Sequence, residues 1–160
     1  MTPELLIQNA ITPALKLLPV VMDSPAARAM LVAIALQESR IQHRRQIGGP
    51  ARSYWQFEQG GGVHGVLTHP VSKPLIQAAL TALDYSPAST ENDCWTAIEH
   101  NDILAATFSR LLLWVLPSPL PAQNSPGGGW STYVSAWRPG KPIRASWDAF
   151  YTEAWDLVMT

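Results

Sequence analysis

Glu38 is the residue of this chain best suited to acid–base chemistry. Apolar residues recur at i, i+3, i+4 and i+7 from Leu31 to Glu38, which predicts a carboxyl on the core-facing stripe of a helix, near its C-terminal end. Burial and the negative end of the helix dipole both disfavour the carboxylate and raise its pKa. A carboxyl that stays protonated near neutral pH can act as a general acid. The alternative is a glutamate at a fraying helix end, solvated or paired with Arg40.

An aromatic segment follows at residues 52–58, Arg-Ser-Tyr-Trp-Gln-Phe-Glu, with Gly48-Gly49-Pro50 before it and Gly60-Gly61-Gly62 after it. Residues 42–70 show neither helical nor strand periodicity, and long irregular stretches in compact domains are often functional. An extended segment would place Tyr54 and Gln56 on one side and Trp55 and Phe57 on the other. One side would pack and the other could line a groove.

Helices are expected to position these residues, so the fold class is mainly α. The periodic segments are 4–18, kinked or broken at Pro13, then 25–38, 72–83, 89–99, 102–116, 130–137 and 147–158. Asn101 and Ser146 are expected as N-caps, and 102–116 as the central buried helix. The glycine triplets at 60–62 and 127–129 are expected to form mobile loops beside a cleft.

Composition limits the function classes. The 160 residues are 47% hydrophobic and 14% charged, which favours one globular domain, 1–160. A net charge of -1 argues against nucleic-acid binding. The four histidines and the single cysteine, Cys94, lack metal-ligand spacing, so neither a metal nor another cofactor is expected. There is no signal-peptide pattern and no apolar run of membrane-spanning length, so a protein made in the cytoplasm and not inserted in the membrane is expected.

The order of these motifs resembles that of the lysozyme-like soluble lytic transglycosylases, especially the phage-encoded type. Glu38-Ser39 matches the Glu-Ser at a helix end, and Ser53-Tyr54-Trp55-Gln56 is similar to Gly-Leu-Met-Gln through Gln56. Residues 136–140, Ala-Trp-Arg-Pro-Gly, stand where the family has an aromatic near Ala-Tyr-Asn-Ala-Gly, with Trp137 in place of the tyrosine. The resemblance spans about residues 25–142.

The resemblance implies a lysozyme-like fold with two lobes around a cleft, and cleavage of peptidoglycan glycan strands. It implies Glu38 as the catalytic acid, with Ser39 and Gln56 orienting the carboxyl and the sugar. Tyr54, Trp55 and Trp137 are candidates for stacking on sugar rings, since aromatic faces pack on their apolar faces, although most tryptophans of a chain are core. The enzyme would be a monomer that reaches the wall by holin release or as part of a virion.

Alternatives to this interpretation stay open at the level of sequence. Glu58 is the nearest following carboxylate and could make the protein a hydrolytic lysozyme that uses two carboxylates. It could equally be a structural surface acid. A non-catalytic wall-binding module and a structural component of a phage particle are further alternatives; a large exposed apolar patch would favour the second of these.

Overall fold

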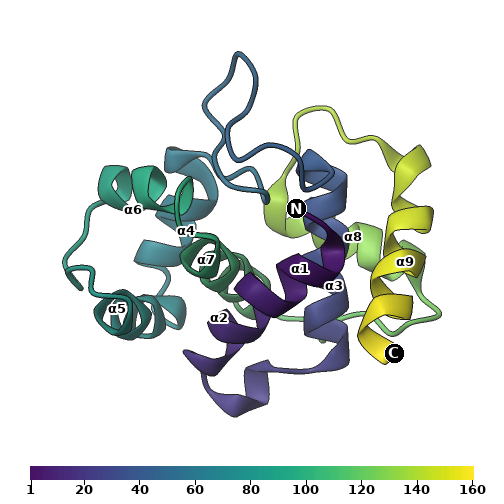
Figure 1. Cartoon of the computed structure of the whole chain (residues 1–160), viewed down its shortest axis with the longest axis horizontal. Helices are drawn as coiled ribbons and strands as arrows, with labels where there is room; N and C mark the ends of the chain where they lie inside the picture. The colour runs from purple at the N-terminus through teal and green to yellow at the C-terminus, as the bar shows by residue number, and fades with distance from the viewer.

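The chain is folded almost entirely into helices in the computed structural model, which describes residues 1–160 (Figure 1). The only β pairing consists of isolated bridges, Arg45 with Arg52 and Arg52 with Phe57. The mainly α prediction is therefore confirmed. In chain order the elements are α1 (Pro3–Leu6), η1 (Ile7–Ile11), α2 (Thr12–Lys16), η2 (Val20–Met22), α3 (Pro25–Ser39), η3 (Gln59–Val63), α4 (His64–Thr68), α5 (Ser72–Ala82), α6 (Glu91–Ile98), α7 (Asp102–Trp114), α8 (Pro126–Trp137), η4 (Arg144–Ser146) and α9 (Trp147–Met159).

Helix α7 lies at the centre of the molecule, as its apolar sequence predicts. Nine of its 13 residues are buried, and the Asn101 side chain caps its start by accepting from Leu104 N at 3.0 Å. In Figure 1, α4, α5 and α6 lie on one side of α7, and α3, α8 and α9 on the other. Helix α7 contacts most of these neighbours and belongs to one cluster of 37 buried apolar residues.

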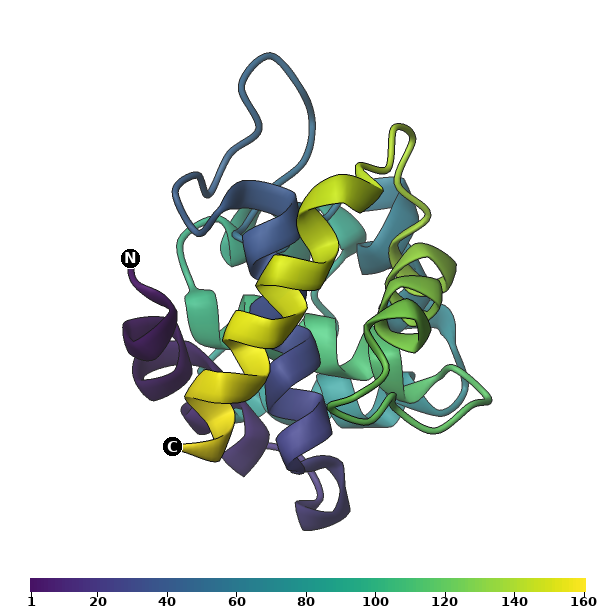
Figure 2. The same cartoon turned by 90° about the vertical axis from the view of Figure 1, so that its right-hand side faces the viewer.

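Helix α3 packs along α9 (Figure 2). Ser24 caps it, with Oγ accepting from Ala27 N at 3.1 Å, and Pro25 occupies the first turn, as the sequence predicts. Ten of its 15 residues are buried. The apolar residues of the predicted stripe, Leu31, Ile34 and Ala35 among them, are buried. Burial extends beyond this stripe, so α3 is covered on nearly all sides and its exposed positions are confined to its ends.

The first helix accommodates Pro13 without breaking. Proline lacks an N–H and its ring collides with the carbonyl of the preceding turn. Residues Ile7–Ile11 form one π-helical turn, closed by Thr12 N on Ile7 O, so α1, η1 and α2 continue into one another. A widened turn is a usual way to place a proline inside a helix.

Both glycine triplets lie in helices, so the prediction of loops at these positions is wrong. Gly60–Gly62 are in η3, which is kinked at Gly61, whose φ of -99° and ψ of -109° are not helical. Gly127–Gly129 form the first turn of α8, which begins at Pro126 and not at Trp130. Two of these glycines are needed for close packing. A Cβ on Gly62 would meet the Phe57 ring at 2.4 Å, and one on Gly129 would meet Tyr151 Cε2 at 2.4 Å.

Two further expectations need correction. Part of the stretch 42–70 is helical, because η3 and α4 occupy residues 59–68. Ser146 makes no cap hydrogen bond at the start of α9; its hydroxyl instead donates to Gln37 Oε1 at 3.0 Å. The connection before α9 is thereby joined to the end of α3. No helix in the structure has both the length and the apolar character needed to span a bilayer.

The glycine packing leads to a stability prediction. Gly129→Ala should lower the free energy of unfolding by about 1–3 kcal/mol, because the new methyl group overlaps the buried Tyr151 ring. Gly127→Ala is the matched control two residues earlier: nothing lies within 4 Å of its Cβ, so the change should be neutral or stabilise by up to about 1 kcal/mol. Urea denaturation measures both, and equal effects of the two substitutions would contradict this account.

Candidate active site

The Glu38 carboxyl lies in the last turn of α3 and is half-buried. Helix α3 stops one residue later because Arg40 adopts a left-handed conformation, with φ 53° and ψ 23°, and its N–H bonds to Leu36 O. Burial raises the pKa of Glu38 to about 7, against the opposing effect of a hydrogen bond from Tyr133. This carboxyl therefore exists in both protonation states near neutral pH.

Tyr133 on α8 is the direct partner of Glu38. Its hydroxyl donates to Glu38 Oε1 at 2.5 Å. The ring is buried and lies parallel to that of Trp147, with centroids 5.2 Å apart and planes at 9°. Burial and the nearby Glu38 raise the pKa of Tyr133, so the hydroxyl keeps its proton and acts only as a donor to the carboxylate. Residues 95 positions apart thus form the centre of the candidate site.

The Ser39 side chain forms hydrogen bonds with the backbone around this site. It is buried, and its hydroxyl donates to Tyr54 O at 2.7 Å and accepts from Ile41 N at 3.1 Å. The bond to Tyr54 fixes the aromatic segment 52–58 against the end of α3. This geometry assigns Ser39 to positioning the site backbone; the structure does not join its side chain to the Glu38 carboxyl.

Indole hydrogen bonds of Trp55 and Trp137 attach the aromatic segment to α3 and α8. Trp55 is completely buried, and its indole N–H donates to Leu31 O at 2.8 Å. Trp137 is half-buried; its indole N–H donates to Trp55 O at 2.8 Å, and its ring lies 5.6 Å from that of Phe57. Trp55 is therefore a core residue, whereas one part of Trp137 remains open to solvent.

Tyr54 and Gln56 occupy different positions in the same segment. Tyr54 is buried, with the Arg44 guanidinium 4.6 Å from its ring centroid. Gln56 is half-buried, and its Nε2 donates to Ser53 O at 2.7 Å, which closes a tight turn. Of the five residues predicted to bind substrate, the structure leaves Gln56 and Trp137 partly exposed and buries the other three.

Glu58 is exposed at the start of η3, where its backbone carbonyl accepts from Gly61 N and Val63 N. Its carboxylate forms no hydrogen bond with Tyr133, whose hydroxyl donates to Glu38. No group of three or more His, Cys, Asp and Glu side chains is arranged to hold a metal ion. Glu38 and Tyr133 are the titratable side chains that a hydrogen bond joins at this site.

Unusual backbone conformations concentrate around this pair. Six residues other than glycine have positive φ, and all but Asp84 lie next to the elements just described: Arg40, Ile41, Ser53, Gln56 and Arg138. Such conformations cost on the order of 1 kcal/mol each outside glycine and asparagine, and they often cluster at functional sites. Ser53 and Gln56 adopt them in the turn held by Ser39 and Trp137.

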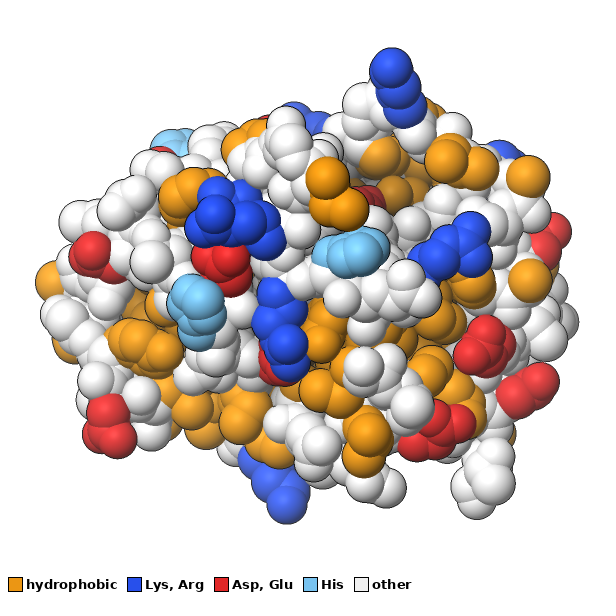
Figure 3. Space-filling view, turned by 45° about the horizontal axis from the view of Figure 1, so that its top comes forward, with side chains coloured by type: hydrophobic (Ala, Val, Ile, Leu, Met, Phe, Trp, Pro, Cys, Tyr) orange, Lys and Arg blue, Asp and Glu red, His pale blue; other side chains and the backbone are white.

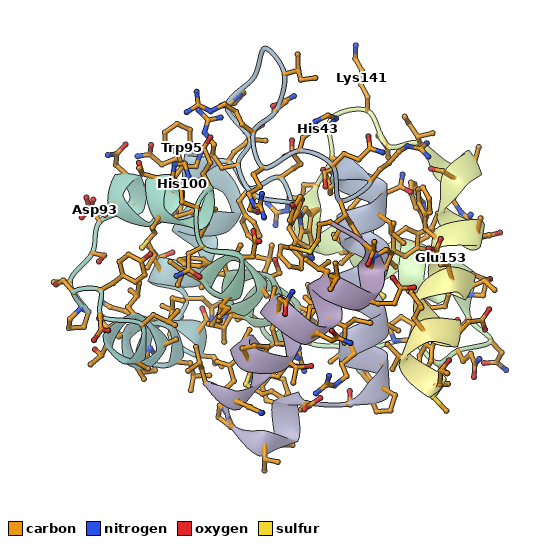
Figure 4. The ribbon with its side chains drawn as sticks, in the orientation of Figure 1. His43, Asp93, Trp95, His100, Lys141 and Glu153 are labelled. Carbon is orange, nitrogen blue, oxygen red and sulfur yellow. The ribbon has the colours of Figure 1, made fainter.

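Basic side chains lie on the face of the molecule where α3 ends (Figure 3). Figure 4 shows His43, from the connection after α3, and Lys141, from the connection after α8, at this same end. The 42–52 connection is fixed over α6 and α7 by salt bridges from Arg44 to Asp102 at 2.8 Å and from Arg45 to Glu99 at 2.7 Å. Trp95, also labelled in Figure 4, donates to Pro50 O at 2.9 Å and strengthens this attachment.

The sequence singles out Glu38 but does not indicate that Tyr133 is its partner. The family resemblance drew attention to Trp137 as the counterpart of a motif tyrosine. A signal for Tyr133 did exist, because Tyr133 and Trp137 stand at i and i+4 and therefore share a helix face. An aromatic face on a short helix predicts a buried contact, but the sequence does not identify which acid that face meets.

The Tyr133 hydrogen bond leads to a prediction for Glu38. Tyr133→Phe removes the donor that stabilises the carboxylate, so the pKa of Glu38 should rise above about 7. Carboxyl-carbon NMR titration of ¹³C-labelled glutamate measures it directly. Tyr85→Phe, which removes a hydroxyl bonded to Asn101, is the control and should leave the Glu38 titration unchanged. An unchanged Glu38 titration in Tyr133→Phe would show that the hydrogen bond does not affect the pKa of Glu38.

Glu38 should also make stability depend on pH. Its folded pKa of about 7 lies above the ordinary 4.5, so the folded state binds the extra proton between these values. The contribution of Glu38 to the free energy of unfolding is then fully present below about pH 4.5 and is lost as pH rises through 7. Glu38→Gln should remove this loss, gaining roughly 1–3 kcal/mol over the parent between pH 4.5 and 8. Urea denaturation across this range measures the difference; parallel pH profiles for the two proteins would contradict the raised pKa.

Comparison with protein-family models, with curated proteins and with solved structures found no match to this chain. The assignment of this candidate site therefore rests on the geometry of its residues.

Proposed function

We propose that this protein is a peptidoglycan-degrading enzyme that cleaves the β-1,4 bond between N-acetylmuramic acid and N-acetylglucosamine by lytic transglycosylation. One observation carries the proposal: a half-buried glutamic acid at a helix end, with its pKa raised to about 7 and a tyrosine hydroxyl on its carboxyl. Such a carboxyl can give a proton and take one back at the same pH. The lysozyme-like arrangement of two lobes around a cleft is part of the proposal.

In the first step, protonated Glu38 donates its proton to the glycosidic oxygen. The bond between this oxygen and the anomeric carbon breaks, and the electron pair leaves with the oxygen. The positive charge that develops at the anomeric carbon resembles an oxocarbenium ion. In the proposed reaction, the carbonyl oxygen of the N-acetyl group of the same sugar stabilises it. The Tyr133 hydroxyl stabilises the Glu38 carboxylate that results.

In the second step, the Glu38 carboxylate removes the proton of the muramic 6-hydroxyl. The oxygen attacks the anomeric carbon and closes a 1,6-anhydro ring, and Glu38 returns to its protonated form. A single carboxyl thus acts first as acid and then as base. The exposed position of Glu58 favours this mechanism over one with two carboxylates, in which the second must lie about 5–10 Å from the first.

The surface around Glu38 supports an anionic glycan as substrate. Arg40 and Arg138 directly follow the helices that carry Glu38 and Tyr133, and both are exposed. Muramic acid and the peptides attached to it carry carboxylates, which such cations attract. The half-exposed Trp137 and Gln56 are the remaining candidates for contact with sugar rings.

The catalytic role of Glu38 can be tested by substitution. Glu38→Gln retains size and hydrogen bonding but has no acidic proton, so turnover of purified peptidoglycan should fall by about 100-fold or more with the fold retained. Glu58→Gln is the matched control and should retain activity within about twofold. Near-normal turnover in Glu38→Gln would remove Glu38 from the reaction.

The products distinguish transglycosylation from hydrolysis. Mass analysis after borohydride reduction should find 1,6-anhydromuramic ends, about 20 mass units lighter than reduced hydrolytic ends because they lack one water and two added hydrogens. Reducible muramic ends as the sole product, together with loss of activity in Glu58→Gln, would instead identify a hydrolytic lysozyme. The absence of soluble products at any pH between 5 and 8 would favour a non-catalytic wall-binding module.

A further inference from the structure

A pocket lies at the opposite end of α3 from Glu38. It has a volume of about 410 Å³, within the range of small-molecule sites. Residues at the start of α3, the end of α7 and the connection after α7 form its wall: Val21, Ser24, Ala26, Arg110, Leu113, Trp114, Leu116, Pro117, Ser118, Pro119 and Leu120. Figure 2 shows the start of α3 far from its end, where the Glu38 site is located. The pocket is therefore separate from that site.

Arg110 in the wall of this pocket is a buried cation with incomplete hydrogen bonding. Its side chain is 97% buried, since its exposed fraction is 3%. Nε donates to Met22 O at 2.7 Å, but the buried Nη1 has no partner in the protein. The Trp114 ring lies 5.1 Å from the guanidinium carbon and packs against it. An unpaired buried arginine is costly, because burial removes water that no other group replaces.

No carboxylate of the chain pairs with Arg110. The acid that influences it is Asp23, but Asp23 already forms a bidentate pair with Arg28, at 2.7 and 2.8 Å. Burial lowers the pKa of Arg110 to about 10, so the guanidinium still carries its charge at neutral pH. The pocket thus has a positive charge in its wall that the protein itself does not neutralise.

The start of α3 adds a second positive contribution. Ser24 and Ala26 line the pocket, and α3 is 15 residues long, so the positive end of its dipole is directed at this region. The Ser24 hydroxyl caps Ala27 N, which leaves the N–H of Ala26 in the first turn without an intrahelical acceptor. Guanidinium and helix end together can bind one anionic group.

The remaining wall selects the rest of the ligand. Leu113, Trp114, Leu116 and Leu120 are apolar side chains, and Pro117 and Pro119 add rigid apolar surface. One arginine balances one negative charge, and its planar fork matches a carboxylate. We propose that this pocket binds a small monocarboxylate with a hydrophobic body, its carboxylate on Arg110 and the α3 start and its body against Trp114 and the prolines.

Titration with 3-phenylpropionate tests the proposal, with 3-phenylpropanamide as the uncharged control. ¹H–¹⁵N NMR of the intact protein should show saturable shifts confined to residues 21–28 and 110–121, with a dissociation constant on the order of 1 mM for a ligand of this size. The amide should bind at least about 10-fold more weakly. Equal binding of acid and amide, or shifts mapping elsewhere, would overturn the proposal.

Two matched variants separate binding from folding. Ala26→Asp places a carboxylate inside the pocket at a helix start, where acids are favourable, so the variant should fold and lose binding of 3-phenylpropionate at least 10-fold. Ala149→Asp makes the same change in the first turn of α9, in a different groove, and should bind like the parent. Undiminished binding by Ala26→Asp would overturn the assignment of the anion to this end of α3.

Discussion

A carboxyl group withdrawn from water needs a donor, and in this protein the Tyr133 hydroxyl supplies it to Glu38. The bond joins the end of α3 to the middle of α8, two helices far apart in the sequence. The aromatic segment between them is held by the same elements, through Ser39 on one side and Trp137 on the other. If the carboxyl were fully solvated, its pKa would return toward 4.5 and the acid would be lost at neutral pH.

Many of the aromatic residues pack around this pair and support it. Tyr133 and Trp147 stack, Trp147 contacts Trp130 and Tyr151, and Gly129 allows Tyr151 to approach α8 closely. The indole N–H groups of Trp55 and Trp137 bind backbone carbonyls, which orients large rings by directional bonds as well as by packing. Rigid support of this kind holds the Glu38 carboxyl in one geometry, as the proposed proton transfer requires.

Helix α3 connects the two regions of chemical interest. Its C-terminal end carries an acid whose neutral form is favoured by burial, and its N-terminal end faces an arginine with no acidic partner of its own. Both features agree with the helix dipole, which disfavours a negative charge at the C-terminal end of α3 and attracts one at its N-terminal end. Because α3 is covered on nearly all sides by α9 and its neighbours, both ends are fixed relative to the same core.

The sequence alone determined the elements with strong local signals. Prolines and caps set the starts of α3 and α7, and apolar periodicity identified α7 as central, because these effects act within one turn of helix. It also singled out Glu38. Contacts that no local pattern specifies decided the rest. Gly62 and Gly129 lie where a Cβ would collide with the Phe57 and Tyr151 rings, and Ser146 bonds to Gln37 in place of capping α9. The pairing of Glu38 with Tyr133 is likewise tertiary, because no local pattern specifies that side chains 95 residues apart will meet. The same holds for Arg110, since no local pattern specifies which charge is left without a partner.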